Sequence, residues 1–361
     1  MKQSGRITPR QFSAAVFVSA LAPLIRRFPR ALAARAGRGA WCAVPLSLLP
    51  MLLLLAAVFL LFRKKPVGTG LADVFSEALG AAAGRVLTGL YGVWFLFYAA
   101  FLLRSDAERF ITTVYNGAAP ALFVAVMAAL CLPAAAGGLL PLGRAAMLLT
   151  PLMIAPVLII GLLTAKDLDL SLLLPLRGMD PLSVGKAALE LANCLSLAFC
   201  FGFFGDSLSR RIRPRDVWPW LLAFLGGIAL MTVGCLGVFG AELTAKMRFP
   251  YFMLARDLSI LGALERAEPV VIALWVFPDF LLISLLLVLG AKCLCRALGA
   301  PPRRICTLAC AAAAVAAALA LPGDLSAFRA LSETLIPLLS AAFGFGPLPL
   351  LLLCSRARKR L

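Results

Sequence analysis

Long apolar runs alternate with short charged loops along most of the chain. Most runs reach the roughly 20 residues that an α-helix needs to cross a bilayer core about 30 Å thick. The pattern predicts an all-α polytopic membrane protein with about ten transmembrane helices. We expect the first run to remain as a helix, because no small-residue cleavage site of a signal peptide follows it. The predicted spans are 11–28, 40–62, 84–105, 118–140, 144–165, 183–208, 217–240, 269–291, 304–321 and 331–354.

The ten spans form two halves of five, 11–165 and 183–354, and each half carries an amphipathic segment at the equivalent position. The first separates the second and third spans, and it places Leu71, Phe75 and Leu79 on one face. The other separates the seventh and eighth spans, where we expect a second helix at about 251–265. Both patterns are typical of helices that lie along a membrane surface. Because five is odd, the second set must be inverted relative to the first, which indicates a 5+5 inverted repeat.

The inverted repeat sets the predicted organisation of the chain. Lys and Arg gather in the loops on the side of both termini, so the positive-inside rule places both termini in the cytoplasm. The predicted parts are a cytoplasmic N-terminus (1–10), a first five-helix repeat (11–165), an outer connecting loop (166–182), a second five-helix repeat (183–354) and a basic cytoplasmic tail (355–361).

The first helix of each repeat is expected to be broken. Pro23 and Pro29 interrupt the first span, while Gly202 and Gly205 interrupt the sixth. In inverted-repeat transporters such breaks lie near the bilayer midplane and form the binding site. A broken helix exposes backbone N–H groups and a positive dipole end, which can hold a carboxylate.

The first outer loop departs from the positive-inside pattern. It carries five arginines on the side where few are expected: Arg26, Arg27, Arg30, Arg35 and Arg38. Something other than topology must hold them there. Arg26 either faces a pocket at the helix break or belongs to the outer loop, and the sequence leaves both alternatives open.

Composition excludes several classes of protein. A hydrophobic content of 62%, with only 14% charged residues, excludes a water-soluble fold. The net charge of +18 comes from short loops rather than from a basic domain, so we expect contacts with membrane lipid and none with nucleic acid. The chain has no His, and its ten Cys form no C-x-x-C pair. We therefore expect no metal, no cofactor and no enzymatic activity.

Several stretches resemble the spore germination receptor B-subunit (germinant permease) family. The resemblance covers about residues 7–300, and the last two helices match only in hydropathy. It implies the amino acid–polyamine–organocation transporter superfamily and a LeuT-like fold with broken helices 1 and 6. The stretches that carry it are ITPRQFSAAVF, PRALAARAGRGAW, ALGAAAGRVLTGLYGVWFLFYAAFLLRSDAERFITT, DLDLSLLLPL and RFPYFMLARDLSILGALERAEPVVIALWVFPDFLLISLLLVLGA.

The resemblance also implies a function. Members sense a nutrient in the inner membrane of a bacterial spore, bind a germinant that is often an amino acid, and work with an A subunit and a lipoprotein C subunit. Many members carry a Glu in the middle of span six, where this chain has Cys194 and Leu195, and the nearest acid is Glu190. Two alternatives stay open: a proton- or sodium-coupled amino acid or amine transporter, and a structural partner with an inactive pocket.

Polar groups inside the spans are the candidate site residues. Asp279 lies midway through span eight, where a carboxylate costs about 2.5–3.5 kcal/mol on insertion scales, so it should face a cavity or a partner. A structural pair with an arginine is the alternative. The candidate ligand-binding residues are Ser19, Pro23, Arg26, Tyr98, Leu102, Asn193, Ser196, Asp279 and Ser284, and the candidate gate or partner contacts are Arg104, Glu108 and Glu190.

The other candidates also have structural alternatives. The hydroxyl of Tyr98 could close the pocket, or its ring could only pack among neighbouring aromatic residues. Asn193 and Ser196 lie deeper in span six than Glu190. Arg104 and Glu108 are spaced for an i,i+4 pair at a helix end, which could serve as a gate or only stabilise the helix.

Overall fold

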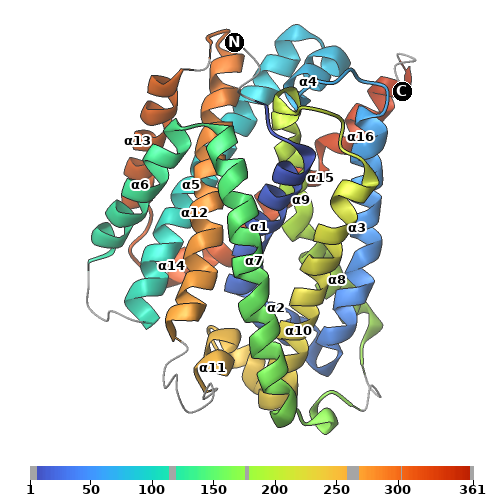
Figure 1. Ribbon diagram of the computed structural model, residues 1–361, viewed down its shortest axis with the longest axis vertical. Coiled ribbons are helices and arrows are strands. Elements are labelled where there is room, and N and C mark those ends of the chain that lie inside the picture. Colours follow the sequence, from blue (N-terminus) through green and yellow to red (C-terminus); the bar gives the residue numbers. More distant parts are fainter. Residues whose placement is uncertain (1–5, 114–118, 175–178, 258–267, 302, 358–361) are drawn as a thin grey trace.

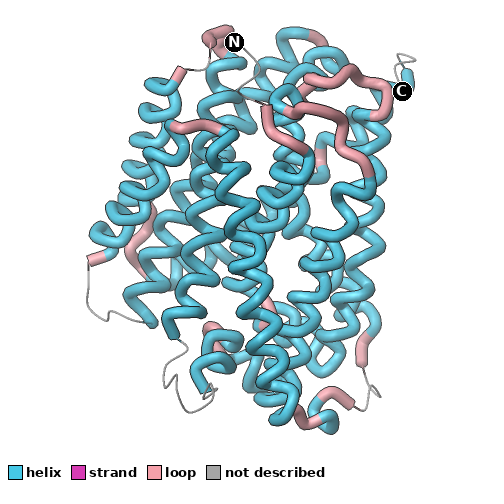
Figure 2. The backbone as a smooth tube through the Cα atoms, viewed as in Figure 1, coloured by secondary structure: helices cyan, strands magenta, loops and turns pink. Residues whose placement is uncertain are grey.

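A computed structural model describes residues 6–113, 119–174, 179–257, 268–301 and 303–357 (Figure 1). These residues fold into helices joined by short loops, and they form no β-sheet (Figure 2). The α-helices are α1 (Pro9–Arg27), α2 (Arg30–Ala36), α3 (Ala40–Phe62), α4 (Leu71–Leu79), α5 (Ala81–Thr113), α6 (Pro120–Ala136), α7 (Leu139–Thr164), α8 (Pro181–Ala192), α9 (Ser196–Cys200), α10 (Pro214–Lys246), α11 (Pro250–Asp257), α12 (Glu268–Ala297), α13 (Arg304–Ala320), α14 (Leu325–Ala330), α15 (Ile336–Phe345) and α16 (Pro347–Ala357).

The helices confirm an all-α membrane architecture. Seven helical segments of the described chain are long and apolar enough to cross a membrane, and three shorter apolar helices accompany them. Helices suit this setting because each satisfies its own backbone hydrogen bonds where no water is available. The three shorter helices are Pro9–Ile25, Pro120–Ala136 and Arg304–Ala320.

The two surface helices lie at opposite ends of the molecule, as an inverted repeat requires. Figure 1 shows α4 at the end where α16 finishes, and α11 at the other end. Leu71 and Phe75 of α4 are fully buried, as its amphipathic pattern predicts. In the second repeat α11 covers 250–257, and the rest of the predicted 251–265 helix lies outside the described residues.

Three long helical segments form the centre of the bundle. In the most apolar stretch of α5, 61% of the residues are buried, and the share is 67% both for Pro181–Ser207 and for α12. The share falls to 28% in α7 and to 22% in the last helical segment. The central segments therefore position the site, while the outer helices expose apolar side chains suited to lipid.

The first helix breaks at the second of its two predicted prolines and not at the first. Pro23 lies inside α1, which continues to Arg27, so the prediction of a break at Pro23 was wrong. The break is at Phe28, which is extended (φ −94°, ψ 147°), and Pro29 precedes the short helix α2. A residue before proline is disfavoured in the α-helical conformation, which explains why the helix stops here.

The sixth span changes its helical type instead of opening into a loop. α8 passes into a 3₁₀ turn at Asn193–Leu195, α9 follows, and a 3₁₀ helix covers Phe201–Ser207, which includes the two glycines predicted to interrupt it. A backbone hydrogen bond joins the end of this segment to the residues just before α1: the amide of Ile7 donates to the carbonyl of Ser207 at 2.9 Å. Both broken helices of the LeuT-like fold are thus present.

Candidate ligand-binding site

A cavity of about 50 Å³ lies where the two broken helices meet α5 and α15. At about 30 Å³ per molecule, this volume accommodates one or two waters. The cavity is lined by Pro23, Arg27, Phe28, Tyr98, Glu190, Asn193, Cys194, Ser196, Leu197, Ile336, Pro337 and Ser340. The structure therefore brings five of the predicted site residues together, and we call this space the central cavity.

Glu190 connects the two broken helices through a pair of arginines. Its carboxylate accepts from Arg27 Nη2 at 2.6 Å and from Arg35 Nε at 2.8 Å. Its side chain is 14% exposed, so much of this charge is removed from water. Two guanidinium groups around one carboxylate leave an excess positive charge beside the cavity.

The other arginines of the loop after α1 also have partners within the protein. Besides the two that bind Glu190, Arg30 lies 3.4 Å from a carboxylate oxygen of Glu333. Arg38 donates to the carbonyl of Leu174 at 3.3 Å. Side chains and carbonyls from distant parts of the chain bind these cations, which a count of charges per loop does not reveal. The side chain of Arg26 is outside the described structure.

The start of α8 is fixed by a capping aspartate. Asp180 accepts hydrogen bonds from the backbone amides of Leu182 and Ser183, both at 3.1 Å, and from the Ser183 hydroxyl at 2.6 Å. The Ser183 hydroxyl and these amides hold the pKa of the Asp180 carboxyl below its ordinary value. The cap satisfies amides at the end of the helix that carries Glu190.

Asn193 and Ser196 supply polar groups where span six changes its helical type. Asn193 Nδ2 donates to the carbonyl of Pro337 at 2.9 Å, and its Oδ1 is buried with no hydrogen-bond partner among the described residues. Ser196 packs directly on α15, because a Cβ added at Gly344 would lie 2.2 Å from Ser196 Cβ. The free Oδ1 of Asn193 is thus available to a ligand donor.

Tyr98 forms the wall that α5 contributes. Its ring stacks on Trp94 with centroids 5.3 Å apart and an interplanar angle of 3°. Trp94 in turn stacks on Phe343 of α15 at 5.4 Å. Packing therefore fixes the ring of Tyr98 while the residue still lines the cavity.

Asp279 lies away from the central cavity in a buried ion cluster. Its Oδ2 accepts from Arg109 Nη2 at 2.6 Å, and Arg109 also pairs with Asp106. The Arg109 guanidinium lies 5.5 Å from the ring centroid of Trp275. The geometry is that of the structural alternative, a carboxylate that an arginine neutralises between α5 and α12.

The remaining candidates whose side chains are described do not line the cavity. Ser19 on α1 and Ser284 on α12 are fully buried, as is Leu102 on α5. Arg104 and Glu108 pair with each other at 2.8 Å, four residues apart on α5.

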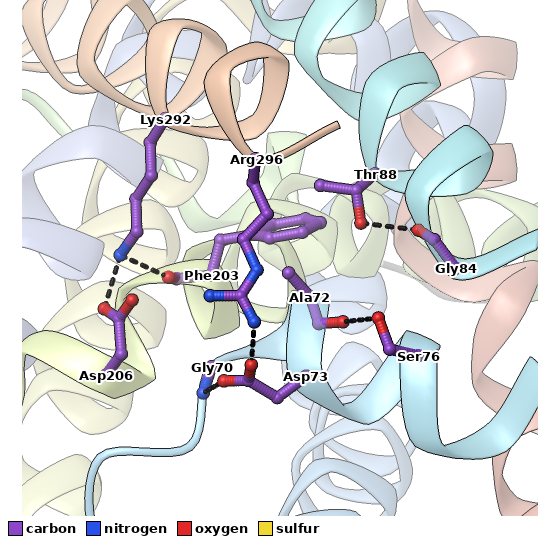
Figure 3. A network of polar contacts seen from close by, with 10 residues as sticks. All are labelled: Gly70, Ala72, Asp73, Ser76, Gly84, Thr88, Phe203, Asp206, Lys292 and Arg296. Carbon is purple, nitrogen blue, oxygen red and sulfur yellow. Dashed lines mark hydrogen bonds and ion pairs between the residues drawn. The ribbon is translucent and has the colours of Figure 1, made fainter. Parts of the chain in front are cut away.

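A polar network fixes the other end of the sixth span (Figure 3). Lys292 of α12 donates to the carbonyl of Phe203 at 2.9 Å and pairs with Asp206. One turn further, Arg296 pairs with Asp73 at the start of α4. Two cations on α12 thus hold both the broken helix and the surface helix of the first repeat.

The cavity includes residues that the sequence did not single out. Ile336, Pro337 and Ser340 come from the last predicted span, in a region where the resemblance rested on hydropathy alone. A proline and a serine inside an apolar run were the available signal. The structure adds that a short π-helical turn at Leu331–Leu335 precedes them.

Solved transporter structures share this fold. MHP1, a nucleobase-cation-symport-1 family transporter in a closed conformation with bromovinylhydantoin bound, matches with a TM-score of 0.62 and 14% identity. A Na⁺-coupled sialic acid symporter in a substrate-bound outward-open state matches with a TM-score of 0.60 and 12% identity. Each match covers 94% of this chain and 78% of the other. At this level of identity the matches establish the LeuT-like fold.

The sequence comparisons give the family. No curated protein matches the chain. The family model described as "Spore germination protein" matches residues 6–321, which is most of the chain and includes both broken helices. The chain therefore belongs to the spore germination protein family of membrane permeases.

Proposed function

We propose that the chain is the membrane subunit of a spore nutrient-germinant receptor that binds a small germinant, most simply an amino acid. The observation that carries this proposal is the central cavity, where Arg27 and Glu190 place opposite charges beside the free Oδ1 of Asn193. A zwitterion matches this arrangement, with its carboxylate toward the guanidinium and its ammonium toward carboxylate and amide oxygens. The spore inner membrane is the proposed location, with both termini in the cytoplasm.

The size of the cavity supports a sensing mechanism based on a change of state. A volume of about 50 Å³ is far below the roughly 300–1,000 Å³ of ordinary small-molecule pockets. An amino acid must therefore select a wider arrangement of α1, span six and α15. A ligand that binds only the wider state shifts the population toward it. The A and C subunits would respond to this shift.

A binding and uptake measurement tests the proposal. Purified protein in proteoliposomes is offered a panel of labelled amino acids, with and without an imposed pH or sodium gradient. Saturable binding without gradient-driven accumulation is the expected result. Absence of binding to every nutrient in the panel, with the protein folded, would contradict the proposal.

Variants link binding to the cavity. Asn193→Leu removes the free oxygen, and Glu190→Gln removes the negative charge between the two arginines. Both should weaken binding at least tenfold and abolish the nutrient response of spores without loss of subunit assembly. Thr150→Val is the matched control, because this buried hydroxyl lies away from the cavity lining and, among the described residues, bonds within α7, to the carbonyl of Ala146 at 2.7 Å. Normal germination in the cavity variants would refute the assignment.

A secondary transporter is the second candidate. The observation that favours it is the fold, which is shared with a transporter described as Na⁺-coupled. Concentrative uptake under the imposed gradient would establish this function, and Glu190 would then be the first residue to test for coupling to the driving ion.

A further inference from the structure

A second and larger cavity lies inside the group formed by α1, α3, α9 and α10. Its volume is about 720 Å³, within the roughly 300–1,000 Å³ typical of ligand pockets. The wall is mainly apolar and aromatic. Its large side chains include Phe12, Phe17, Phe59, Trp220 and Phe224.

This cavity is separate from the central cavity. No described residue of α5, α12 or α15 lines it, whereas the central cavity uses both α5 and α15. The two spaces lie on different sides of the sixth span, because Leu195 and Ala198 face the larger one while Cys194 and Leu197 face the smaller one. A ligand of the larger cavity therefore does not occupy the proposed germinant site.

The rim of the larger cavity is strongly basic. Two of its cations have acidic partners: Lys65 pairs with Glu77, and Arg210 lies 2.7 Å from a carboxylate oxygen of Asp216. Arg211 donates to backbone carbonyls. Arg63 and Arg213 are exposed and form no ion pair within the described structure. The rim cations are Arg63, Lys65, Arg210, Arg211 and Arg213, and the charge that they leave unbalanced favours an anion.

One buried polar group also points to a ligand. Ser13 lines the cavity and is 5% exposed, and its hydroxyl has no hydrogen-bond partner among the described residues. A buried hydroxyl without a partner is costly, so an acceptor supplied by a ligand would stabilise it. The hydroxyl lies one helical turn inside α1, on the apolar side of the rim.

The depth of the cavity matches one leaflet of a bilayer. Along α1 its lining extends from Phe12 to Ala20, which at 1.5 Å per residue is about 12 Å. One leaflet contributes about half of the roughly 30 Å hydrocarbon core. An acyl chain whose headgroup lies at the rim would therefore fill the cavity without reaching past the middle of the bilayer.

We propose that this cavity holds one acyl chain of an anionic membrane phospholipid. The phosphate lies on Arg63, Arg211 and Arg213, an ester carbonyl accepts from Ser13, and the chain fills the space between the aromatic side chains. The site is a lipid site of the cytoplasmic leaflet, because the basic loops mark that side. It is independent of which nutrient the central cavity binds.

The test measures lipid retention and stabilisation on the full chain. Purified, delipidated protein in a mild detergent is titrated with phosphatidylglycerol, with phosphatidylcholine of the same acyl chains, or with inorganic phosphate alone. Native mass spectrometry counts bound lipids, and thermal unfolding reports stabilisation. We expect one tightly retained phosphatidylglycerol and a rise in melting temperature that phosphatidylcholine and phosphate do not produce.

Two variants locate the site, and each has a matched control. The double change Arg63→Gln/Arg213→Gln should weaken phosphatidylglycerol binding at least tenfold, whereas Arg144→Gln, an exposed cation on α7 away from the rim, should not. Ala198→Phe fills the cavity and should exclude the lipid, whereas Ala129→Phe on the exposed face of α6 should not.

Three outcomes would overturn the proposal. Equal stabilisation by both phospholipids would show that the rim does not select charge. An equal effect of inorganic phosphate would reduce the site to an anion site without an acyl chain. Undiminished retention in folded Ala198→Phe would place the lipid elsewhere on the surface.

Discussion

Removing the arginine of the buried ion cluster tests why Asp279 lies in the middle of an apolar helix. Arg109 is 4% exposed and donates to both Asp279 and Asp106, so Arg109→Met removes the guanidinium that the two carboxylates share. Breaking a buried ion pair by deleting one partner costs about 3–5 kcal/mol. With an unfolding entropy of about 2.1 cal/mol/K per residue over 361 residues, this lowers the melting temperature by about 4–7 °C.

The assay is thermal unfolding of purified protein in detergent at neutral pH. Arg85→Met, an exposed arginine on the same helix, is the control and should stay within about 0.5 kcal/mol. The double change Arg109→Met/Asp279→Leu should recover part of the loss, because it removes one of the two buried carboxylates that lose the guanidinium, while Asp106 remains. The recovery gives the coupling energy between the two residues.

Two results would contradict the structural role of Asp279. If Arg109→Met shifted the melting temperature by less than 1 °C, the ion cluster would not be a stabilising feature. If Asp279→Asn also abolished nutrient binding in a protein of normal stability, the carboxylate would belong to the site despite its distance from the central cavity.

Three further predictions concern packing, the polar network and capping. Gly344→Ala should cost about 1–3 kcal/mol, because its Cβ would overlap Ser196, and Ser196→Gly should recover part of the loss; a stabilised Gly344→Ala protein would contradict this contact. Lys292→Met should speed amide hydrogen exchange at Phe203–Ser207, and unchanged exchange would show that Asp206 and Lys292 do not hold this segment. The lowered pKa of Asp180 means that its cap contributes fully above the ordinary carboxyl pKa and is lost as the pH falls through the lowered value. Asp180→Asn should remove this part of the acid dependence of the melting temperature, and an identical profile would exclude the cap as its source.

The limits of sequence reasoning appear at the break in the first helix. The sequence pointed to Pro23 and Pro29, but proline is tolerated inside a membrane helix when neighbouring helices satisfy the freed backbone groups. Whether a given proline bends, breaks or stays inside a helix depends on packing around it. Pro23 continues the helix, and the break falls at Phe28.

Charge pairing across the molecule was equally invisible in the sequence. The contacts of Glu190 with Arg27 and Arg35 join residues 163 and 155 positions apart. That of Arg109 with Asp279 joins residues 170 apart. No periodicity links such positions, so a single polar residue in a span was consistent with a ligand site and with a structural pair. The tertiary structure distinguishes the two cases, because Glu190 lines the central cavity and Asp279 does not.

Hydropathy and charge along the chain by themselves determined the membrane class, the spans and the inverted repeat, because these depend on local segment length, on loop charge and on an odd number of spans per repeat. The tertiary structure alone decided that the first helix continues past Pro23, which polar residues share a cavity and which neutralise one another. Those features depend on contacts between side chains distant in sequence, whose energies exist only once the helices are packed.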